Sequence, residues 1–505
     1  MSKTQKINAW NVDLYIVTWN VSSKYPDASP LTNLLGLEKN PENDNHQPDF
    51  YVIGLQEINA QPQNMVLGFF KDDPWTQRFK EILKERDYVA VKSEQMQGML
   101  LILFAKRKHI LHLRQIETEY TRTGLGGMWG NKGAISIRLS LYGTAVSIVN
   151  AHLAAHDHML DERIVDFNQI LDNHHYHVKM YREIFDHDYV FWFGDLNFRL
   201  NGENETTPQD IRAMIQKDKL SELLDRDQLN SVRKEGRAFY QLNERLPAFP
   251  PTFKFERGTS NYDMKRRPAW CDRILYKVRA DAYQNVQLSI EQTSYKSHPG
   301  YTISDHKPVT SEFVIKVVEK PQHEQPTANR FIGIRSFRSM EPVDFGDGVQ
   351  HQMMHNELYP DSENSIPVQV FEDPAEKSIE FAYIPSWHIG EDNSILYTIP
   401  EGFEENDGTD WIAIYRSDFS SFSEYVGYEY TARVDEKKSP RTKNRNVRRS
   451  LRLEFSENID LTDGESYILL YFQSTGLKGV TGMAGMSNVF RAEKRPPSPR
   501  FEAVD

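Results

Sequence analysis

Cysteine, long apolar runs and excess positive charge are all scarce in this sequence. The 505 residues include a single cysteine, Cys271, which excludes an intrachain disulfide and any zinc site built on several cysteines. The longest apolar run, residues 99–105, is far shorter than the ~20 residues of a membrane-spanning helix. The first residues lack the basic and apolar segments of a signal peptide. We therefore expect a soluble cytosolic protein that can still bind a membrane surface.

Basic residues are outnumbered, with 60 lysines and arginines against 72 aspartates and glutamates and a net charge of −12. Proteins that bind nucleic acids normally carry a basic surface, so the composition argues against a nucleic acid as partner. Hydrophobic residues make up 39% of the chain and aromatic residues 12%, which is enough to form packed cores. A chain of this length is expected to form two domains.

Residues 10–318 alternate strand-like and helix-like segments, which predicts an α/β domain. Apolar or alternating runs typical of strands lie at 12–17, 50–53, 135–141, 145–149 and 189–193. Helical patterns fall between them, at 75–84 and 162–181. The histidines of residues 173–177 are interpreted as a polar helix face rather than a metal site, because no carboxylates accompany them at ligand spacing.

A polar, proline-containing segment begins near residue 320 and separates this region from the C-terminal part. We assign residues 319–365 to a linker and a segment without predicted structure. Residues 366–492 contain short strand-like runs and almost no helical pattern, which predicts an all-β sandwich. Its expected strands are 379–384, 411–415, 450–455 and 467–472. Residues 493–505 are interpreted as a tail.

Several predicted strands of the first domain end in a residue suited to metal or phosphate chemistry. A single aspartate after a strand is more often a turn former or a helix cap. Six such strand ends are hard to explain as turns, because strand ends of α/β sheets gather functional groups in one cleft. The residues are Asn20, Glu57, His152, Asp195 with Asn197, Asp272, and Asp305 with His306.

Two longer segments make this hypothesis specific. Residues 191–199 and 266–275 resemble the two signatures of the inositol polyphosphate 5-phosphatases, and shorter segments around Asn20, Glu57, 129–133, 150–153 and 304–306 fit the same family. The resemblance covers roughly the first 318 residues. It implies an α/β fold like that of DNase I, in which two packed sheets form a sandwich flanked by helices.

The resemblance also implies a role for each of these residues around a Mg²⁺ ion. Glu57 would be the main ligand of the metal, with Asn20 beside it, because Mg²⁺ prefers oxygen ligands and keeps several waters. Asp195 would orient and deprotonate the attacking water. Asn197 would steady the phosphoryl group.

Two histidines complete the implied site. His306 and His152 would donate hydrogen bonds to the phosphate oxygens. Asp272 would hydrogen-bond His306, raise its pKa and keep it cationic. Asp305 would belong to the metal or water network.

Cations around this site, with a tyrosine beside the second signature, are the candidates for substrate recognition. Lys132 is expected to approach the scissile phosphate, and Tyr262, Lys265 and Arg266 to contact the neighbouring 4-phosphate. Alternatively, Lys265, Arg266 and Arg267 form a solvated basic turn. Members of the family often carry a lysine where this chain has Met264, and Lys265 is the candidate to replace it.

The apolar run at residues 65–70 has two interpretations. It is either buried, which is the commoner fate of such a run, or an exposed loop whose Phe69 and Phe70 enter lipid beside the active site, as the family resemblance suggests. Cys271 lies inside the second signature at a position that we interpret as packing, so no cysteine nucleophile is proposed.

Scattered aromatic residues of the C-terminal region resemble a SKICH domain, an immunoglobulin-like β-sandwich that targets membranes or partners. Alternatively, the region is an unrelated β-sandwich that packs on the catalytic domain. The order of the two domains resembles the skeletal muscle and kidney enriched inositol phosphatase group of the family. Residues 437–449 are basic without an acidic residue, which makes an anionic membrane a plausible partner.

The sequence as a whole predicts a Mg²⁺-dependent enzyme that removes the 5-phosphate of phosphoinositides such as PI(4,5)P2 and PI(3,4,5)P3, with soluble inositol polyphosphates as further candidate substrates. We expect it in the cytoplasm, peripherally attached to the plasma membrane or the endoplasmic reticulum, with an unknown protein partner bound by the C-terminal domain. The alternatives are a Mg²⁺-dependent nuclease and a non-catalytic phosphoinositide-binding scaffold. Because every candidate catalytic residue precedes the linker, residues 1–318 are expected to be active alone.

Overall fold

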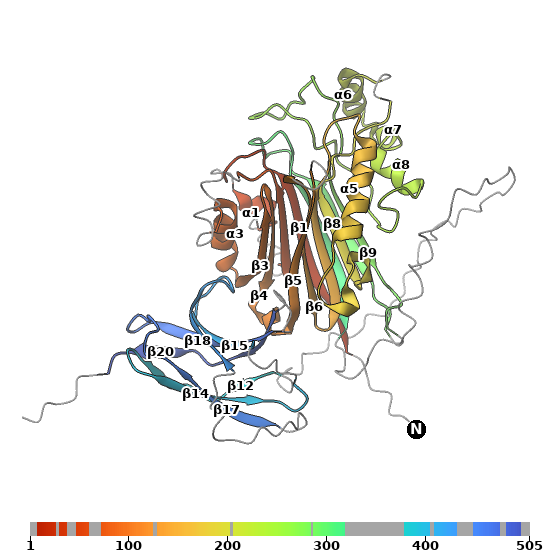
Figure 1. Cartoon of the computed structure of the whole chain (residues 1–505). Coiled ribbons are helices and arrows are strands. Elements are labelled where there is room, and N and C mark those ends of the chain that lie inside the picture. The colour runs from red at the N-terminus through yellow and green to blue at the C-terminus, as the bar shows by residue number, and fades with distance from the viewer. Residues whose placement is uncertain are drawn as a thin grey trace, which may run out of the picture.

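The computed structural model describes residues 8–26, 30–37, 47–59, 72–124, 129–202, 206–283, 286–318, 378–403, 409–431, 448–474 and 481–495. In the N-terminal domain two β-sheets lie face to face, with helices outside them (Figure 1). The first sheet has six strands in the order β10-β11-β1-β2-β4-β3. In that order they span Ile290–Ser297, Val309–Val318, Ala9–Asn20, Phe50–Gln56, Met99–Lys106 and Tyr88–Met96.

The second sheet contributes β5-β6-β7-β8-β9 from the N-terminal domain. These strands span Leu113–Thr123, Trp129–Leu141, Thr144–His152, Tyr189–Asp195 and Asp272–Val278. Every residue of β2, β7 and β8 is buried, as expected for central strands that are covered on both faces. The apolar segments that predicted strands at 50–53, 145–149 and 189–193 all lie in them.

The helices α3 and α5 pack on the outer faces of the two sheets. Trp75, Phe79 and Ile82 of α3 share a core with the outer face of the first sheet, and Phe167 and Ile170 of α5 do so with the second. The helices are α1 (Leu31–Leu34), α3 (Pro74–Lys84), α5 (Leu160–Asn173), α6 (Pro208–Gln216), α7 (Leu220–Leu224) and α8 (Gln228–Lys234), with 3₁₀ turns at Arg107–His112 (η2), Lys179–Tyr181 and Ile184–Asp186.

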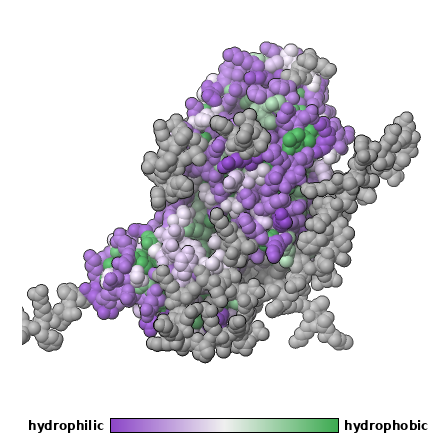
Figure 2. All heavy atoms as spheres, viewed as in Figure 1, coloured by the Kyte–Doolittle hydropathy of each residue, from purple (hydrophilic) through white to green (hydrophobic). Residues whose placement is uncertain are grey.

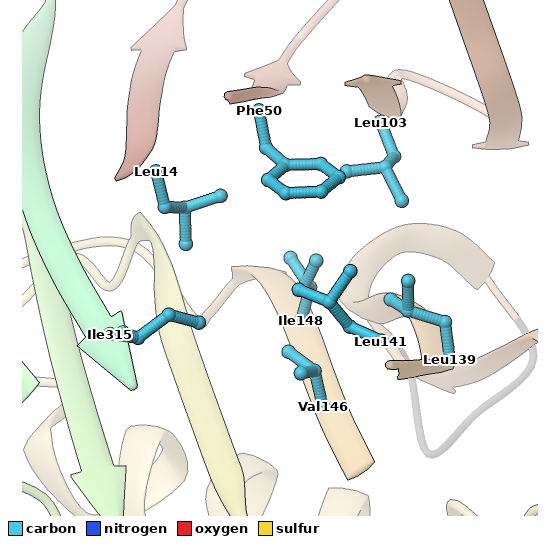
Figure 3. A pocket seen from close by; sticks show the side chains of 8 residues that line it. All are labelled: Leu14, Phe50, Leu103, Leu139, Leu141, Val146, Ile148 and Ile315. Carbon is cyan, nitrogen blue, oxygen red and sulfur yellow. The ribbon is translucent and has the colours of Figure 1, made fainter. Parts of the chain in front are cut away.

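A third, apolar layer fills the space between the two sheets. Side chains from both sheets surround a small gap there: Leu14, Phe50, Leu103, Leu139, Leu141, Val146, Ile148 and Ile315 (Figure 3). None of these side chains carries a polar group, so the gap is a feature of core packing and not a binding site for a polar ligand. The candidate site residues lie elsewhere, at the strand ends.

The C-terminal domain is built of strands in the described residues, which confirms the predicted fold class of an α/β sandwich followed by an all-β domain. One sheet has the order β12-β14-β17. The strands β13, β20, β18 and β19, with β15 and β16 attached beside β18, continue the second sheet of the N-terminal domain into an 11-stranded sheet. The strands β12 to β20 span Glu380–Phe381, Ser386–His388, Asn393–Ile399, Trp411–Arg416, Tyr425–Tyr430, Arg449–Phe455, Ser466–Ser474, Thr481–Met486 and Phe490–Glu493. In the part of the chain that the structure describes, we find no helix with the length and apolar character to cross a membrane.

Two local predictions are wrong. The helix expected over 162–181 ends at Asn173, because the following His174 turns into the protein, where its ring nitrogens lie 3.0 Å from the Thr121 hydroxyl and 2.6 Å from the Ser136 hydroxyl. The histidines of 173–177 are therefore not a polar helix face. The strand expected over 379–384 is reduced to the two residues of β12.

Candidate active site

Strand pairing in the first sheet brings three candidate residues to one end of the sandwich. β1 and β2 are parallel with Asn20 opposite Gln56, so Asn20 and Glu57 sit at adjacent strand ends. β11 runs antiparallel to β1 and begins where β1 ends, with Val309 opposite Thr18. His306, just before β11, therefore lies at the same end.

The second sheet delivers the other candidates to the same place. β7 and β8 are parallel with His152 opposite Asp195, and the antiparallel β9 begins with Asp272 opposite Asp195. The side chains of the two sheets touch here, because the Asn20 amide donates to Asp195 over 2.9 Å. The predicted convergence thus brings Asn20, Glu57, His152, Asp195, Asp272 and His306 together. The prediction that Asp272 and His306 follow strand ends is wrong, because Asp272 begins β9 and His306 precedes β11; both strands are antiparallel to their neighbours, so their starts lie at this end of the sandwich.

Two glycines allow the backbones to come this close. Gly194, directly before Asp195, has a φ of 139°, and a Cβ there would lie 1.9 Å from the carbonyl oxygen of Ala151. Gly133 has a φ of 137°, and a Cβ would lie 1.9 Å from the carbonyl oxygen of Thr121. No other residue fits at either position, so both glycines of the predicted motifs have a steric reason.

Asp195 lies at the centre of the cluster. Its Oδ2 is 2.9 Å from the Asn20 amide, 3.3 Å from His152 Nε2 and 3.8 Å from His306 Nε2. Burial acts to raise the pKa of Asp195, but the charge of His306 and the hydrogen bond with His152 outweigh it and hold the pKa below its usual value. Asp195 is therefore a buried, ionised carboxylate at neutral pH.

His306 and Asp272 form a buried pair. His306 Nδ1 is 3.0 and 3.2 Å from the two carboxylate oxygens of Asp272, and the Thr252 hydroxyl donates to Asp272 over 2.6 Å. Burial alone would lower the pKa of His306, but the charges of Asp272 and Asp195 overcome it and raise the pKa to about 9. The Nε2 of His306 thus points toward Asp195 as a cationic donor at neutral pH.

Glu57, with Asn20 beside it, is the residue suited to hold a metal ion. The Glu57 side chain is 45% exposed, and its Oε1 accepts from the Asn20 amide over 3.0 Å. The φ of 53° at Glu57 takes this residue out of the β2 strand conformation. The exposed carboxylate of Glu57 matches the preference of Mg²⁺ for oxygen ligands and retained waters, so it fits the ion. The Asn20 side chain is buried, with its oxygen accepting from the Ser22 backbone over 3.0 Å, and its amino group orients the Glu57 carboxylate at this site.

A second group could in principle hold a metal, since ligand atoms of Asp195, Asp272 and His306 lie within 4.8 Å of one another. The hydrogen bonds favour a different use of this group. His306 Nδ1 already binds both oxygens of Asp272, which also accepts from Thr252. We therefore interpret these three residues as a charge-stabilised dyad beside the buried carboxylate.

Lys132 and His152 contact each other on the other side of Asp195. The Lys132 ammonium is within hydrogen-bond distance of His152 Nε2. Burial and the charge of Lys132 lower the pKa of His152, so this histidine is neutral at pH 7. Burial also lowers the pKa of Lys132, against the charges of Asp195 and Glu57. The structure thus brings the predicted phosphate-binding lysine to the predicted phosphate-binding histidine.

Arg199 is a site residue to which the sequence pattern assigned no role. Asn197, with a φ of 58°, donates through its side-chain amide to the carbonyl oxygen of Leu153 over 3.1 Å. The guanidinium of Arg199 donates to Asn197 Oδ1 over 2.6 Å and stacks 4.4 Å from the centre of the Phe253 ring. Because its oxygen is held by Arg199, the Asn197 amide is fixed in orientation. Arg199 is the last residue of the first signature, and this position was the feature of the sequence that could have identified it as a site residue.

Asp305 points to cations of a neighbouring loop. Its carboxylate lies 3.0 Å from Lys254 Nζ and 3.8 Å from the Arg257 guanidinium. Burial acts to raise its pKa, but the charge of His306 and the hydrogen bond with Lys254 lower it. This geometry suits a residue that holds basic side chains beside the site. Neither Lys254 nor Arg257 was singled out from the sequence, because the loop that carries them has no strand-end pattern.

Of the remaining predicted residues, Tyr262, Lys265 and Arg266 lie on one loop, and Phe69 and Phe70 lie outside the described residues. Tyr262 stacks on Phe255 with ring centres 4.3 Å apart and donates its hydroxyl to the carbonyl oxygen of Pro251 over 2.7 Å. Lys265 and Arg266 are exposed on the same loop. Phe69 and Phe70, together with most of the basic segment 437–449, lie outside the described residues.

Comparisons with known proteins agree with the predicted family and with the order of the two domains. Residues 17–312 match the family model described as Endonuclease/Exonuclease/phosphatase family 2, and residues 379–492 match that of the SKICH domain. The chain is 39% identical over 311 residues to phosphatidylinositol 4,5-bisphosphate 5-phosphatase A of Homo sapiens. It is 37% identical over 318 residues to inositol polyphosphate 5-phosphatase K of Mus musculus. The matches cover 60% and 61% of this chain but only 30% and 66% of the two relatives.

A solved structure resembles the N-terminal domain. The inositol polyphosphate 5-phosphatase domain of SPsynaptojanin, in complex with inositol (1,4)-bisphosphate and a calcium ion, is 32% identical with a TM-score of 0.53. The likeness covers 62% of this chain and 87% of that one. The chain therefore belongs to the endonuclease/exonuclease/phosphatase family 2, and within it to the inositol polyphosphate 5-phosphatases, with a SKICH domain after the catalytic domain.

Proposed function

We propose that this phosphatase hydrolyses the 5-phosphate of phosphoinositides, such as PI(4,5)P2 and PI(3,4,5)P3, in a Mg²⁺-dependent reaction. Soluble inositol polyphosphates are further candidate substrates. The observation that carries the proposal is the buried, ionised Asp195 between the cationic His306 and the Asn20–Glu57 pair. The similarity to a phosphatidylinositol 4,5-bisphosphate 5-phosphatase and to an inositol polyphosphate 5-phosphatase supports the substrate class.

Positioning and charge stabilisation account for most of the catalysis. The lowered pKa of Asp195 makes it a weak base, so its main task is to orient the attacking water and accept its proton as the new P–O bond forms. Cationic His306 then donates to a phosphate oxygen on which negative charge accumulates. The amide of Asn197, oriented by Arg199, holds the phosphoryl group.

Lys132 and His152 bind the phosphate opposite His306. When a phosphate enters, the Lys132 ammonium exchanges its contact with His152 for a contact with the phosphate, and neutral His152 donates a hydrogen bond as well. Glu57 would hold the Mg²⁺ ion, with its carboxylate oriented by Asn20. When bound, this ion supplies Lewis-acid polarisation of the phosphate and its leaving oxygen.

The proposal is tested by phosphate release from a panel of short-chain phosphoinositides and soluble inositol phosphates, with Mg²⁺ or with EDTA. Release from lipids with a 5-phosphate, only when Mg²⁺ is present, is expected. A parallel assay with supercoiled DNA tests the nuclease alternative. DNA cleavage without phosphate release would favour the nuclease, and binding of phosphoinositides without any turnover would favour the scaffold.

The Glu57→Gln variant tests the proposed metal ligand. Because the amide keeps the shape but loses the charge, we expect the Mg²⁺ concentration for half-maximal activity to rise by about tenfold or more, since loss of one ligand charge weakens oxygen-based ion binding. A Mg²⁺ titration at saturating substrate measures it. Glu57 is 45% exposed, so the thermal midpoint should stay the same. An unchanged Mg²⁺ requirement would remove Glu57 from the metal site.

The pH profile should show an alkaline limb set by His306. Its pKa of about 9 in the folded protein lies above the ordinary value of 6.5, so the cationic form is present at neutral pH and is lost as the pH rises through 9. The contribution of the His306–Asp272 pair to folding is complete below pH 6.5 and disappears over the same range. Asp272→Asn should shift the limb toward lower pH. An alkaline limb that does not move in this variant would exclude His306 as its source.

We further propose that the enzyme works in the cytoplasm at the surface of the plasma membrane or the endoplasmic reticulum, with Phe69 and Phe70 as lipid contacts. Replacement of both by Ser should reduce turnover of PI(4,5)P2 in vesicles by about tenfold or more, because two buried aromatic side chains contribute strongly to membrane affinity. Turnover of a short-chain soluble substrate should stay the same. Equal losses on both substrates would indicate a structural role for this segment.

A further inference from the structure

We propose that the SKICH domain is a fixed part of the catalytic unit, docked on the open edges of the two catalytic sheets, and that this docking stabilises the phosphatase fold. Movement between domains is the default when they share only a small, polar interface. Figure 1 places the C-terminal domain against the side of the sandwich that carries β3, β4 and β5, away from α5 to α8. Figure 2 shows less hydrophilic surface near this junction than over the helices.

Both catalytic sheets have an edge strand at this junction. β3 ends the first sheet, and its Ala90 accepts a backbone hydrogen bond from Phe422 over 3.1 Å and donates one to Ser420 over 2.7 Å. β5 is the catalytic strand next to β19, with Ile116 opposite Thr481. Such edges otherwise present unpaired backbone groups that invite aggregation.

The edge strands depart from regular pairing at the contact positions. The β3–β4 register shifts between Ala90 and Lys92, and the β5–β6 register shifts between Arg114 and Glu117. Bulges at sheet edges redirect the backbone. In this protein the shift in β5 leaves Ile116 without a partner in β6, and Ile116 pairs with Thr481 instead. Ala90 stays opposite Phe104 of β4, and its backbone groups on the other side bond to the C-terminal domain.

Apolar packing continues across the junction. β15 and β18 are buried on both faces. In β15, Ile412 and Ile414 lie in the core of the C-terminal domain. The alternate residues Ala413 and Tyr415 belong to the same cluster as the core between the catalytic sheets. The side chains of this second, outer face are Ala413, Tyr415, Phe419, Ile468, Leu470, Phe472 and Met483. An isolated C-terminal domain would expose this apolar face to water.

Polar contacts fix the orientation of the docked domain. The Arg107 guanidinium lies 4.3 Å from the centre of the Phe419 ring and donates to the carbonyl oxygen of that residue over 2.7 Å. Lys80 of α3, whose side chain is 11% exposed, forms an ion pair with Glu424. Shape, backbone pairing and charge thus together fix how the C-terminal domain docks on the catalytic domain.

Gly482 gives the sharpest test of the contact. A Cβ there would lie 2.9 Å from the Cα and 3.1 Å from the Cδ of Arg114, and 3.1 Å from the carbonyl oxygen of Leu113. These three nearest atoms all belong to the catalytic domain. Alanine at this position is therefore opposed mainly by the docked neighbour.

The test compares Gly482→Ala with Gly300→Ala, because a Cβ at Gly300 meets nothing within 4 Å. In the full chain, Gly482→Ala should lower the thermal midpoint by about 3 to 8 °C, as expected for overpacking at a rigid contact. Gly300→Ala should leave the midpoint unchanged. Equal midpoints in the two variants would contradict the proposal.

A second measurement works even if Gly482→Ala fails to fold. A site-specific protease sequence is inserted within residues 319–377 and cut after folding. The two halves of the otherwise unchanged chain should co-elute on size exclusion, and Lys80→Glu should weaken their association while Lys80→Glu with Glu424→Lys restores it. Separation of the unchanged halves at micromolar concentration, with full activity in the catalytic half, would overturn the proposal and support the expectation that residues 1–318 act alone.

Discussion

Asp195→Asn should reduce turnover by about 10³-fold or more, because it removes both the proton acceptor and one of the charges that keep His306 cationic. The substitution keeps the size of the side chain. The carboxylate that is lost contacts Asn20 over 2.9 Å, His152 over 3.3 Å and His306 over 3.8 Å. Initial rates at saturating Mg²⁺ and substrate measure the effect on kcat.

The control for this variant is a carboxylate outside the site. Asp161 pairs with Arg237 on the surface and is 83% exposed, so Asp161→Asn should retain the activity of the parent protein. The thermal midpoint of Asp195→Asn should stay close to that of the parent, since the loss is assigned to chemistry. If Asp195→Asn keeps more than about a tenth of the activity, the proposed general base is wrong.

His306→Ala should have the second-largest effect, a loss of about 10²- to 10³-fold in kcat, which is the usual result of removing one donor to a developing oxyanion. Asp272→Asn acts through His306 and should cause a smaller loss by itself. In the His306→Ala background it should add almost nothing, because its only catalytic partner is gone.

The double-mutant cycle separates this dyad from the alternative use of the same residues as metal ligands. Ligands of one ion would couple through the Mg²⁺ requirement, so Asp272→Asn would change the metal titration curve. If Asp272 and His306 form a dyad instead, Asp272→Asn should move the alkaline limb of the pH profile and leave the Mg²⁺ requirement unchanged. Losses that multiply in the double variant would contradict the dyad.

The positions of the strand ends could be predicted because they depend on the residues of the strand itself. Apolar runs predict where β2, β7 and β8 lie, and the polar residue at or after the end of each run then lies at the carboxyl end of its strand. The pairing of Asn20 with Asp195 across the sandwich follows once the two sheets pack with these ends together. The resemblance to the family added a role for each of these residues, which periodicity alone does not provide.

Contacts made by long loops were not predictable in this way. Lys254 and Arg257 reach Asp305 from a loop without periodic pattern, so nothing in their own neighbourhood marks them. The helix after Leu160 was predicted too long because its polar continuation resembles a surface helix. A buried niche for His174, formed by Thr121 and Ser136, overrides that local preference.

The docking of the two domains is also visible in the sequence, in an apolar strand to which no second packing partner was assigned. Residues 467–472 are apolar throughout, whereas a strand on the outside of a separate sandwich would alternate. The structure gives the reason, since β18 is buried on both faces. An uninterrupted apolar strand in a small β-domain is therefore a sign of a second packing partner.

The position of the phosphate that is removed tests the central claim most directly. Short-chain PI(4,5)P2 is incubated with the full chain in Mg²⁺, and the lipid product is identified by chromatography against phosphatidylinositol 4-phosphate and 5-phosphate standards. We expect phosphatidylinositol 4-phosphate as the product, formed with Mg²⁺ but not with EDTA and not by Asp195→Asn. Formation of the 5-phosphate, or turnover that persists in the Asp195→Asn protein, would contradict it.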